Sequence, residues 1–162
     1  MTGELSHAQI EALLLSQVTG RIGCHADGRT FVVPVTYAYA DGSIYGYTGE
    51  GLKVELMRKN PRVCFEVDHE ANLAHWESVI IQGEYEELTG DRAAIALTLL
   101  LRRMQEHMGE TGRLSVSEAM ERATWPGQKP VAYRIRIVEM TGRFESHRGA
   151  TDLLYSMQEN VH

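Results

Sequence analysis

The chain has 162 residues, of which 43% are hydrophobic, and a formal net charge of −6 at pH 7. This length predicts a single domain over residues 1–162, with enough apolar content to bury a continuous core. The acidic balance argues against a nucleic-acid or anionic-membrane surface, because such partners are bound by clustered positive charge.

The N-terminal segment has the pattern of an amphipathic helix. Ser6 and Gln9 have the spacing of a capping box, which predicts a helix over residues 6–18 that covers one end of the core. Glutamate and histidine side chains interrupt the apolar pattern, so the segment does not resemble a secretion signal, and no apolar run reaches a membrane-spanning length. We therefore expect a cytoplasmic protein.

Two Asp-Gly dipeptides separate three β-rich runs after this helix. Asp27-Gly28 and Asp41-Gly42 are strong hairpin signals, because a type I′ turn needs positive φ at both central positions. Pro34 in the middle run cannot donate to a ladder, so it should lie at a strand edge or at a break in pairing, where a ligand could approach the backbone. The predicted antiparallel strands cover residues 20–26, 30–40 and 43–48.

A glycine-flanked lysine follows the third strand. Gly49 and Gly51 precede Lys53, and apolar residues at helical spacing predict a short helix that begins at the lysine and ends at Pro61. Glycines allow a sharp turn, so free N–H groups at the helix start can face an anion while Lys53 adds a positive charge. For so short a motif, the alternative is a solvated loop with a surface lysine.

The rest of the chain predicts three more strands and two helices. Residues 69–77 are expected to form a loop. A strongly apolar helix over residues 91–107 is expected to pack in the core, and a shorter helix is expected over residues 116–123. Six strands would close into a barrel without sheet edges, filled by side chains, so a large ligand must bind outside it or between two copies. The remaining strands are predicted over residues 62–68, 78–88 and 131–144.

The cysteines and histidines show no metal-binding or redox motif. Cys24 and Cys64 lie on separate predicted strands, and we interpret them as small buried hydrophobic residues in a reducing cytosol. His69 and His75 flank a polar loop without the paired spacing of metal ligands. No metal site is predicted.

From Gly20 to Leu88, the order, spacing and turn residues resemble those of the FMN-binding split-barrel family, the pyridoxamine 5′-phosphate oxidase-like fold. The branch they resemble is that of nitroimidazole-resistance-like flavin-nucleotide-binding proteins. The resemblance implies a mainly β protein, a six-stranded antiparallel split β-barrel of Greek-key topology with N-terminal and peripheral helices. It also implies a homodimer with FMN at the interface. The matching segments are GRIGCHADG, VVPVTYAYADGSIYGYT, EGLKVELMRKNPRVCFEVD and WESVIIQGEYEEL.

The resemblance also implies which residues contact the cofactor. In the family, one strand offers backbone groups to the pyrimidine edge of the isoalloxazine ring, and a turn offers hydroxyl, N–H and ammonium donors to the phosphate. The ring-facing strand matches Pro34, Val35, Thr36 and Tyr37. The phosphate turn matches Tyr47, Thr48, Gly49, Gly51 and Lys53. A position that meets the cofactor from the other side matches Trp76 and Ser78, although Trp76 could equally be an aromatic lid on the dimer core.

The implied function is FMN binding with oxidoreductase activity on a small acceptor, in which the flavin carries the chemistry. Tyr47 stands where nitroimidazole-resistance proteins typically have a histidine, so nitroreductase chemistry does not follow. Arg134 and Arg136 alternate as on an exposed strand face, and they do not form the arginine-rich substrate signature of pyridoxamine-phosphate oxidases. The candidates for proton transfer are His25, Tyr37 and Tyr47.

Two other functions are compatible with the same fold, because fold alone does not fix chemistry. A haem-binding or haem-degrading protein would need an axial ligand such as His75 or His147 and would show a Soret band. A non-catalytic flavin carrier or sensor would hold FMN without turnover with any reduced nicotinamide.

Overall fold

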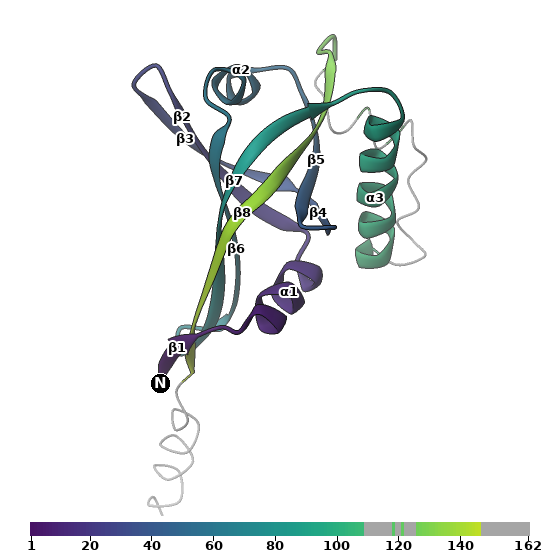
Figure 1. Ribbon diagram of the computed structural model, residues 1–162. Coiled ribbons are helices and arrows are strands. Elements are labelled where there is room, and N and C mark those ends of the chain that lie inside the picture. The colour runs from purple at the N-terminus through teal and green to yellow at the C-terminus, as the bar shows by residue number, and fades with distance from the viewer. Residues whose placement is uncertain (109–117, 119–120, 122–125, 147–162) are drawn as a thin grey trace, which may run out of the picture.

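The computed structural model describes residues 1–108, 118, 121 and 126–146 (Figure 1). An open antiparallel sheet dominates it, with the strand order β3-β2-β6-β7-β8-β5-β4, and β1 pairs with β8. This mainly β architecture with peripheral helices is the predicted split barrel. The strands are β1 (Thr2–Glu4), β2 (Thr19–Ala26), β3 (Arg29–Thr36), β4 (Ala38–Ala40), β5 (Ser43–Gly49), β6 (Arg62–Asn72), β7 (His75–Leu88) and β8 (Pro130–Ser146). The helices are α1 (His7–Ser16), α2 (Leu52–Lys59) and α3 (Gly90–Met108).

Both predicted Asp-Gly turns are confirmed. Asp27 and Gly28 have φ values of 53° and 71°, and Asp41 and Gly42 have values of 50° and 66°. Positive φ at both central residues is the geometry of a type I′ turn, which matches the twist of the strands on either side. The first turn joins β2 to β3, and the second joins β4 to β5.

The predicted strand over residues 30–40 is two strands, because the chain breaks at Tyr37. β3 pairs with β2, whereas β4 pairs with β5. The Tyr37 N–H donates to the carbonyl of Val18 at 3.0 Å, which continues the pairing with the β2 side by one residue beyond Thr19 and Thr36. In the strand order, β3 has β2 as its one neighbour, so β3 and β5 are not hydrogen-bonded to each other.

This break leaves the barrel open, so the prediction that its strands close without edges was wrong. β3 lies at one end of the strand order, and β5 with the short β4 lies at the other. Residues 46–49 of β5 pair with β8 alone. We call the gap between the outer edge of β3 and this part of β5 the seam.

The predicted loop over residues 69–77 is instead the tip of a long hairpin. β6 continues to Asn72 and β7 begins at His75, with an irregularity in pairing between Glu70 and Asn72. β8 supports the same end of the sheet, since it pairs with β7 from the start of β7 onward. The side chains of β6 from His69 to Asn72 are exposed, so no alternation of apolar and polar residues marks them as a strand.

Side chains fill the interior of the barrel, as predicted for one this small. Ile22, Phe65, Ile81 and Ile135 are fully buried there. Tyr37 adds an edge-to-face contact with Phe65, with ring centroids 5.1 Å apart. A ligand of any size must therefore bind outside this core.

α1 packs across one end of the barrel, where the sequence placed it. Ser6 and Gln9 form the predicted capping box, and Ile10, Leu13 and Leu14 are buried. The helix predicted over residues 116–123 lies mostly outside the described residues. None of the described helices is long and apolar enough to cross a membrane.

Candidate functional site

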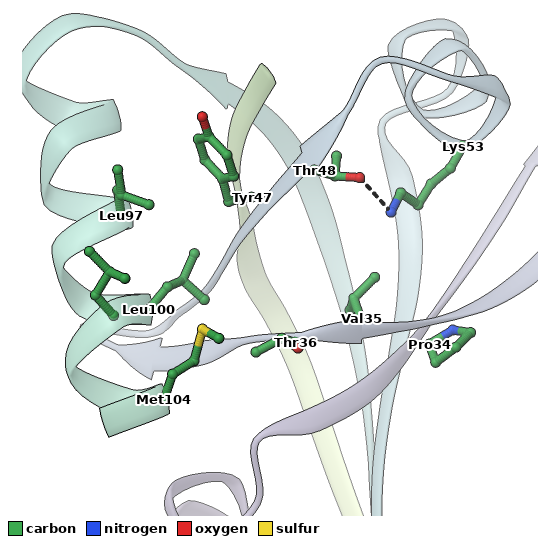
Figure 2. Close-up of a pocket in the computed structure, with 10 residues that line it drawn as sticks. Pro34, Val35, Thr36, Tyr47, Thr48, Lys53, Leu97, Leu100 and Met104 are labelled. Atoms are coloured by element: carbon green, nitrogen blue, oxygen red, sulfur yellow. Dashed lines mark hydrogen bonds between the residues drawn. The ribbon is translucent and has the colours of Figure 1, made fainter. Parts of the chain in front are cut away.

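A cavity of about 270 Å³ lies at the seam, between the two unpaired ends of the sheet and α3 (Figure 2). Six residues that the sequence assigned to the cofactor site line it together: Pro34, Val35 and Thr36 of β3, Tyr47 and Thr48 of β5, and Lys53 of α2. The opposite wall consists of Leu97, Leu100, Leu101 and Met104 of α3. The prediction therefore identified one side of the cavity and missed the other.

Lys53 reaches the cavity from the first turn of α2. Its ammonium donates a hydrogen bond to the Thr48 hydroxyl oxygen at 3.1 Å. Burial lowers the pKa of Lys53, and the nearby Cys24 thiol opposes this shift. A half-buried ammonium with a lowered pKa gains most from an anion, because the anion replaces the solvation that burial removed.

Lys53 differs from the other lysine on α2 in its surroundings, because it lacks a carboxylate partner in the described chain. Lys59 forms an ion pair with Asp27 at the exposed end of the helix. Arg58, on the same helix, is shared between Glu50 and Glu87. Lys53 forms no ion pair among the described residues, and its hydrogen-bond partner, Thr48, is neutral. The cavity therefore contains a positive charge that no carboxylate of the described chain offsets.

The turn before α2 adds backbone donors. Gly51 is the N-cap residue, and it has no side chain that could accept from the N–H groups of the first turn. These N–H groups have no acceptor within the helix, and they carry partial positive charge. The turn is held in place by a hydrogen bond from the Glu50 N–H to the carbonyl of Lys129 at 2.9 Å.

Gly49 and Gly51 have different surroundings. A Cβ at Gly49 would lie 2.0 Å from Oε1 of Gln128, whereas a Cβ at Gly51 would meet nothing within 4 Å. The absence of a side chain at Gly49 therefore makes room for the Gln128 side chain. At Gly51, no neighbouring atom occupies the space beside the start of α2. Neither glycine lines the cavity itself.

Tyr47 and Thr48 are neighbours on β5 and both line the cavity. Successive side chains on a strand point to opposite sides, so Thr48 faces Lys53 while Tyr47 lies on the side of α3 (Figure 2). Burial raises the pKa of the Tyr47 hydroxyl, which keeps it neutral and able to donate.

Two contacts position α3 beside the cavity. Ala93 and Ala96 lie in a small cluster with Ala132 and Tyr47, and their small side chains let the helix approach the sheet. Further along α3, the Arg103 guanidinium donates to the carbonyls of Leu15 and Gln17 at the end of α1. A cation at this helix end is also favoured by the helix dipole.

Several other predicted site residues lie away from the cavity. Tyr37 is in the core, and its hydroxyl donates to the carbonyl of Leu14 at 2.6 Å, so its side chain is not placed for proton transfer there. His25 lies on the outer face of β2, with Nδ1 2.8 Å from the Thr30 hydroxyl. The proposed roles of these two side chains in proton transfer therefore have no support in the geometry.

Trp76 and Ser78 lie at the other end of the sheet, near the strand β1. The Trp76 indole donates to Glu145 at 3.0 Å, and Ser78 pairs with Arg143 of β8. Trp76 lines a separate cavity of about 240 Å³ together with His75. Within one chain, neither residue can meet a ligand held at the seam.

The cysteines occupy opposite faces of the sheet. Cys24 is buried in the core, as predicted. Cys64 pairs with Gly23 on the outer face and is only half-buried, so the prediction that it is a buried hydrophobic residue was wrong. The described residues contain no group of three or more histidine, cysteine or acidic side chains that could hold a metal ion. His147, a predicted axial-ligand candidate, lies outside the described residues.

Comparison with known proteins identifies relatives of this fold. A curated protein of Rhizobium meliloti (strain 1021), named only as uncharacterised, is 30% identical over 84 residues, which are 52% of this chain and 56% of that protein. The aligned part thus spans about half the length of this relative.

Two solved structures are similar over most of the chain. A FAD-binding protein from Mesorhizobium loti is 31% identical, with a TM-score of 0.70 over 90% of this chain and 99% of that one. A putative 5-nitroimidazole antibiotic resistance protein from Bacteroides thetaiotaomicron has the same fold at 20% identity, with a TM-score of 0.68 over 89% and 87% of the two chains.

A family model described as "Pyridoxamine 5'-phosphate oxidase" matches residues 6–144, which include the seam, α2 and all of α3. The match spans most of the chain. The chain belongs to the pyridoxamine 5′-phosphate oxidase family.

Proposed function

We propose that this protein binds FMN at the seam and acts as a flavin-dependent oxidoreductase on a small acceptor. The observation that carries the proposal is the Lys53 ammonium, which is half-buried, has no carboxylate partner in the described chain and is hydrogen-bonded only to Thr48. Together with the N–H groups at the start of α2, it offers the charge-assisted contacts that a phosphate requires. Flavin binding by the Mesorhizobium relative is consistent with this proposal.

The edge of β3 suits the ring of the cofactor. Pro34, Val35 and Thr36 lie on a strand whose outer edge has no strand partner among the described residues, so its backbone groups are available to a ligand. Bound flavin would supply hydride or electron transfer. The chain's own contribution is to hold the phosphate, orient the ring along β3 and shield it with α3.

The test is a comparison of FMN with riboflavin, which lacks the phosphate. Lys53→Ala should raise the dissociation constant of FMN by roughly ten- to a hundredfold, because a hydrogen bond to a charged group contributes about 1.5–3 kcal/mol. Riboflavin binding should change little. Lys59→Ala is the matched control on the same helix, and it should leave both ligands unaffected. Equal weakening of FMN and riboflavin by Lys53→Ala would disprove a phosphate site at Lys53.

The absorption spectrum of the purified protein separates the cofactor classes. Flavin bands are expected, whereas a Soret band would favour the haem alternative. Under anaerobic conditions, reduction of the bound FMN by a reduced nicotinamide followed by reoxidation by an acceptor would support an oxidoreductase. Bound FMN without such turnover would favour the carrier or sensor.

We also propose that the protein is a homodimer in which each cofactor contacts both chains. A cavity of about 270 Å³ is smaller than the roughly 300–1,000 Å³ of pockets that enclose most of a ligand. Trp76 and Ser78 are too far along the sheet to complete the seam of their own chain. The outer sheet face also exposes Val32 (65% accessible) and Ile80 (44%), which a second copy would cover.

A hybrid experiment tests the shared site. Lys53→Ala and Trp76→Ala should each weaken both FMN sites of a homodimer. In a hybrid of the two variants, one site carries both substitutions and the other carries neither. One tight FMN per hybrid dimer is therefore expected, and no tight site would show that Trp76 acts within its own chain. A monomer in sedimentation with FMN bound would exclude the dimer altogether.

A cytoplasmic location completes the proposal. Cys24 and Cys64 point to opposite faces of the sheet, so they cannot bridge each other within the chain, and a reducing compartment would keep both as thiols. Cell fractionation with an antibody to the protein tests the location.

A further inference from the structure

We propose that Arg58 is a positioning residue of the phosphate site, because it holds the Glu50 carboxylate beside α2 and away from the start of that helix. At the helix start, the carboxylate would compete with a phosphate for the same N–H groups. The inference rests on the function proposed above, which assigns the start of α2 to the cofactor phosphate.

Glu50 places a carboxylate inside the glycine turn. It lies between Gly49 and Gly51, directly before the N-cap of α2, and its side chain is 37% exposed. Carboxylates are favoured at the start of a helix, because they accept from its free N–H groups and meet the positive end of its dipole. The N-cap of α2 supplies no side chain that accepts from these N–H groups. An unrestrained Glu50 would therefore occupy donors that the phosphate needs and repel its charge.

Arg58 draws this carboxylate along the helix. Its Nη2 atom lies 2.7 Å from Oε1 of Glu50. Arg58 belongs to the last turn of α2, whereas Glu50 precedes the first turn. At the usual rise per residue, Gly51 and Arg58 are roughly 10 Å apart along the helix axis. The Glu50 side chain must therefore extend away from the helix start to form this ion pair.

A second carboxylate fixes Arg58 itself. The Nε–H of Arg58 donates to Oε1 of Glu87 at the end of β7, and the Tyr85 hydroxyl donates to the same oxygen at 3.1 Å. Arg58 lowers the pKa of Glu87, so this partner is ionised at neutral pH. The guanidinium is thus tied to the sheet and cannot follow the Glu50 side chain to the helix start.

The backbone of Glu50 is fixed separately from its side chain. The Glu50 N–H donates to the Lys129 carbonyl at 2.9 Å, so loss of Arg58 would free the side chain without releasing the turn. The Lys129 ammonium also lies near enough to Glu87 to lower the pKa of that carboxyl. Arg58 and Lys129 therefore offset Glu50 and Glu87, and the charge of Lys53 remains available to the phosphate.

The first experiment compares FMN with riboflavin by flavin fluorescence in the cofactor-free protein. Arg58→Met should weaken FMN about three- to tenfold and leave riboflavin nearly unchanged. The loss should be smaller at about 0.5 M than at about 0.05 M sodium chloride, since salt screens exposed charges. Lys59→Met is the matched control, because it removes a cation of the same turn whose partner is Asp27, and it should weaken neither ligand. Equal weakening of FMN and riboflavin, or a loss that salt does not change, would overturn the proposal, since Arg58 would then act through packing.

The second experiment is a rescue. Glu50→Gln removes the competing carboxylate, so adding it to Arg58→Met should restore FMN affinity to within about twofold of the original protein. A double variant that binds FMN as weakly as Arg58→Met would show that Arg58 does not act through Glu50.

A third variant leaves Arg58 in place, and it tests the proposal even if Arg58→Met fails to fold. Glu50→Asp shortens the side chain, so the carboxylate no longer reaches Arg58 and stays at the helix start. FMN should bind about threefold more weakly, the usual size of a charge effect at a helix end, whereas Glu50→Gln alone should not weaken it. Equal FMN affinity of the aspartate and glutamine variants would contradict the proposal.

Lys53→Ala separates this inference from the function on which it rests. If Lys53→Ala weakens FMN selectively and the Arg58 and Glu50 variants do not, the phosphate site stands and only this inference fails. If none of these variants distinguishes FMN from riboflavin, the phosphate does not bind at α2, and both fail.

Discussion

The paired strands β7 and β8, which we call the wall, differ from the seam in how their polar groups are hydrogen-bonded. In the wall, β7 pairs with β8 along its full length, and Glu84 and Glu86 pair across it with Arg136 and Arg134. At the seam, β3 and β5 do not pair, and Lys53 forms no ion pair with a described residue. The difference shows that the candidate site lies where the ladder of backbone hydrogen bonds stops.

The largest expected effect concerns the packing of the wall. Ile135→Ala should lower the free energy of unfolding by about 2–5 kcal/mol, because it removes a fully buried side chain and leaves a cavity. Thr36→Ala, at the exposed edge of the seam, should change it by no more than about 0.5 kcal/mol. Urea unfolding of the cofactor-free protein measures both. Similar losses for the two variants would mean that the seam is as important for stability as the wall.

The second expected effect is a pH dependence of FMN affinity that comes from Lys53 at the seam. FMN binding favours the charged form of Lys53, so FMN affinity should fall as pH rises through the pKa of this lysine. Because burial lowers that pKa, the fall should begin at lower pH than for an ordinary lysine. Lys53→Met should abolish the fall, and riboflavin should not show it. An alkaline loss that persists in Lys53→Met would point to another group.

The stability of the cofactor-free protein should also depend on pH through Lys53. Stability should rise with pH, whereas FMN affinity should fall. The unfolded chain keeps Lys53 protonated to higher pH than the folded chain does, so the unfolded state binds more protons in this range. Stability should therefore rise with pH between the folded and unfolded pKa values, relative to Lys53→Met. Thermal unfolding at a series of pH values measures this difference, and parallel curves for the two proteins would contradict it.

A smaller effect on stability is expected at Tyr37, the core residue that follows β3. Tyr37→Phe removes the hydroxyl that donates to the Leu14 carbonyl, so stability should fall by about 1 kcal/mol, the usual net value of a hydrogen bond. FMN affinity should not change, because the Tyr37 side chain does not line the cavity. A loss of FMN affinity without a loss of stability would return Tyr37 to the site.

The smallest effect is expected on the outer face of the wall. Arg136→Ala should cost no more than about 1 kcal/mol of stability, since it breaks only an exposed ion pair with Glu84. FMN binding and turnover should be unchanged. Reduced turnover in this variant would revive the alternative that the alternating arginines of β8 bind a substrate phosphate.

The sequence predicted one half of the cavity well because local chemistry specifies it. The Asp-Gly turns fix the hairpins, and the glycines before Lys53 place that lysine at a helix start. The α3 wall was missed because its leucines were interpreted as core. A signal was available: IALTLLL covers more of a helix surface than one buried stripe requires, so some of these side chains must face something other than the sheet.

Long-range features were harder to predict. The predicted strand over residues 30–40 changes its partner after Tyr37, from β2 to β5, and no local residue marks this change. Trp76 was expected in a loop, and it lies in a strand because β8 extends to pair with it. Contacts of this kind depend on residues far apart in the chain.

Pro34 has a consequence for the behaviour of the protein at high concentration. A strand edge with free N–H and C=O groups invites other chains to add as further strands, which is a route to fibrillar aggregates. Pro34 lies in the edge strand β3 and has no N–H, so an added strand would find an interrupted row of donors. The residue that leaves room for a ligand therefore also protects the open edge from uncontrolled self-assembly.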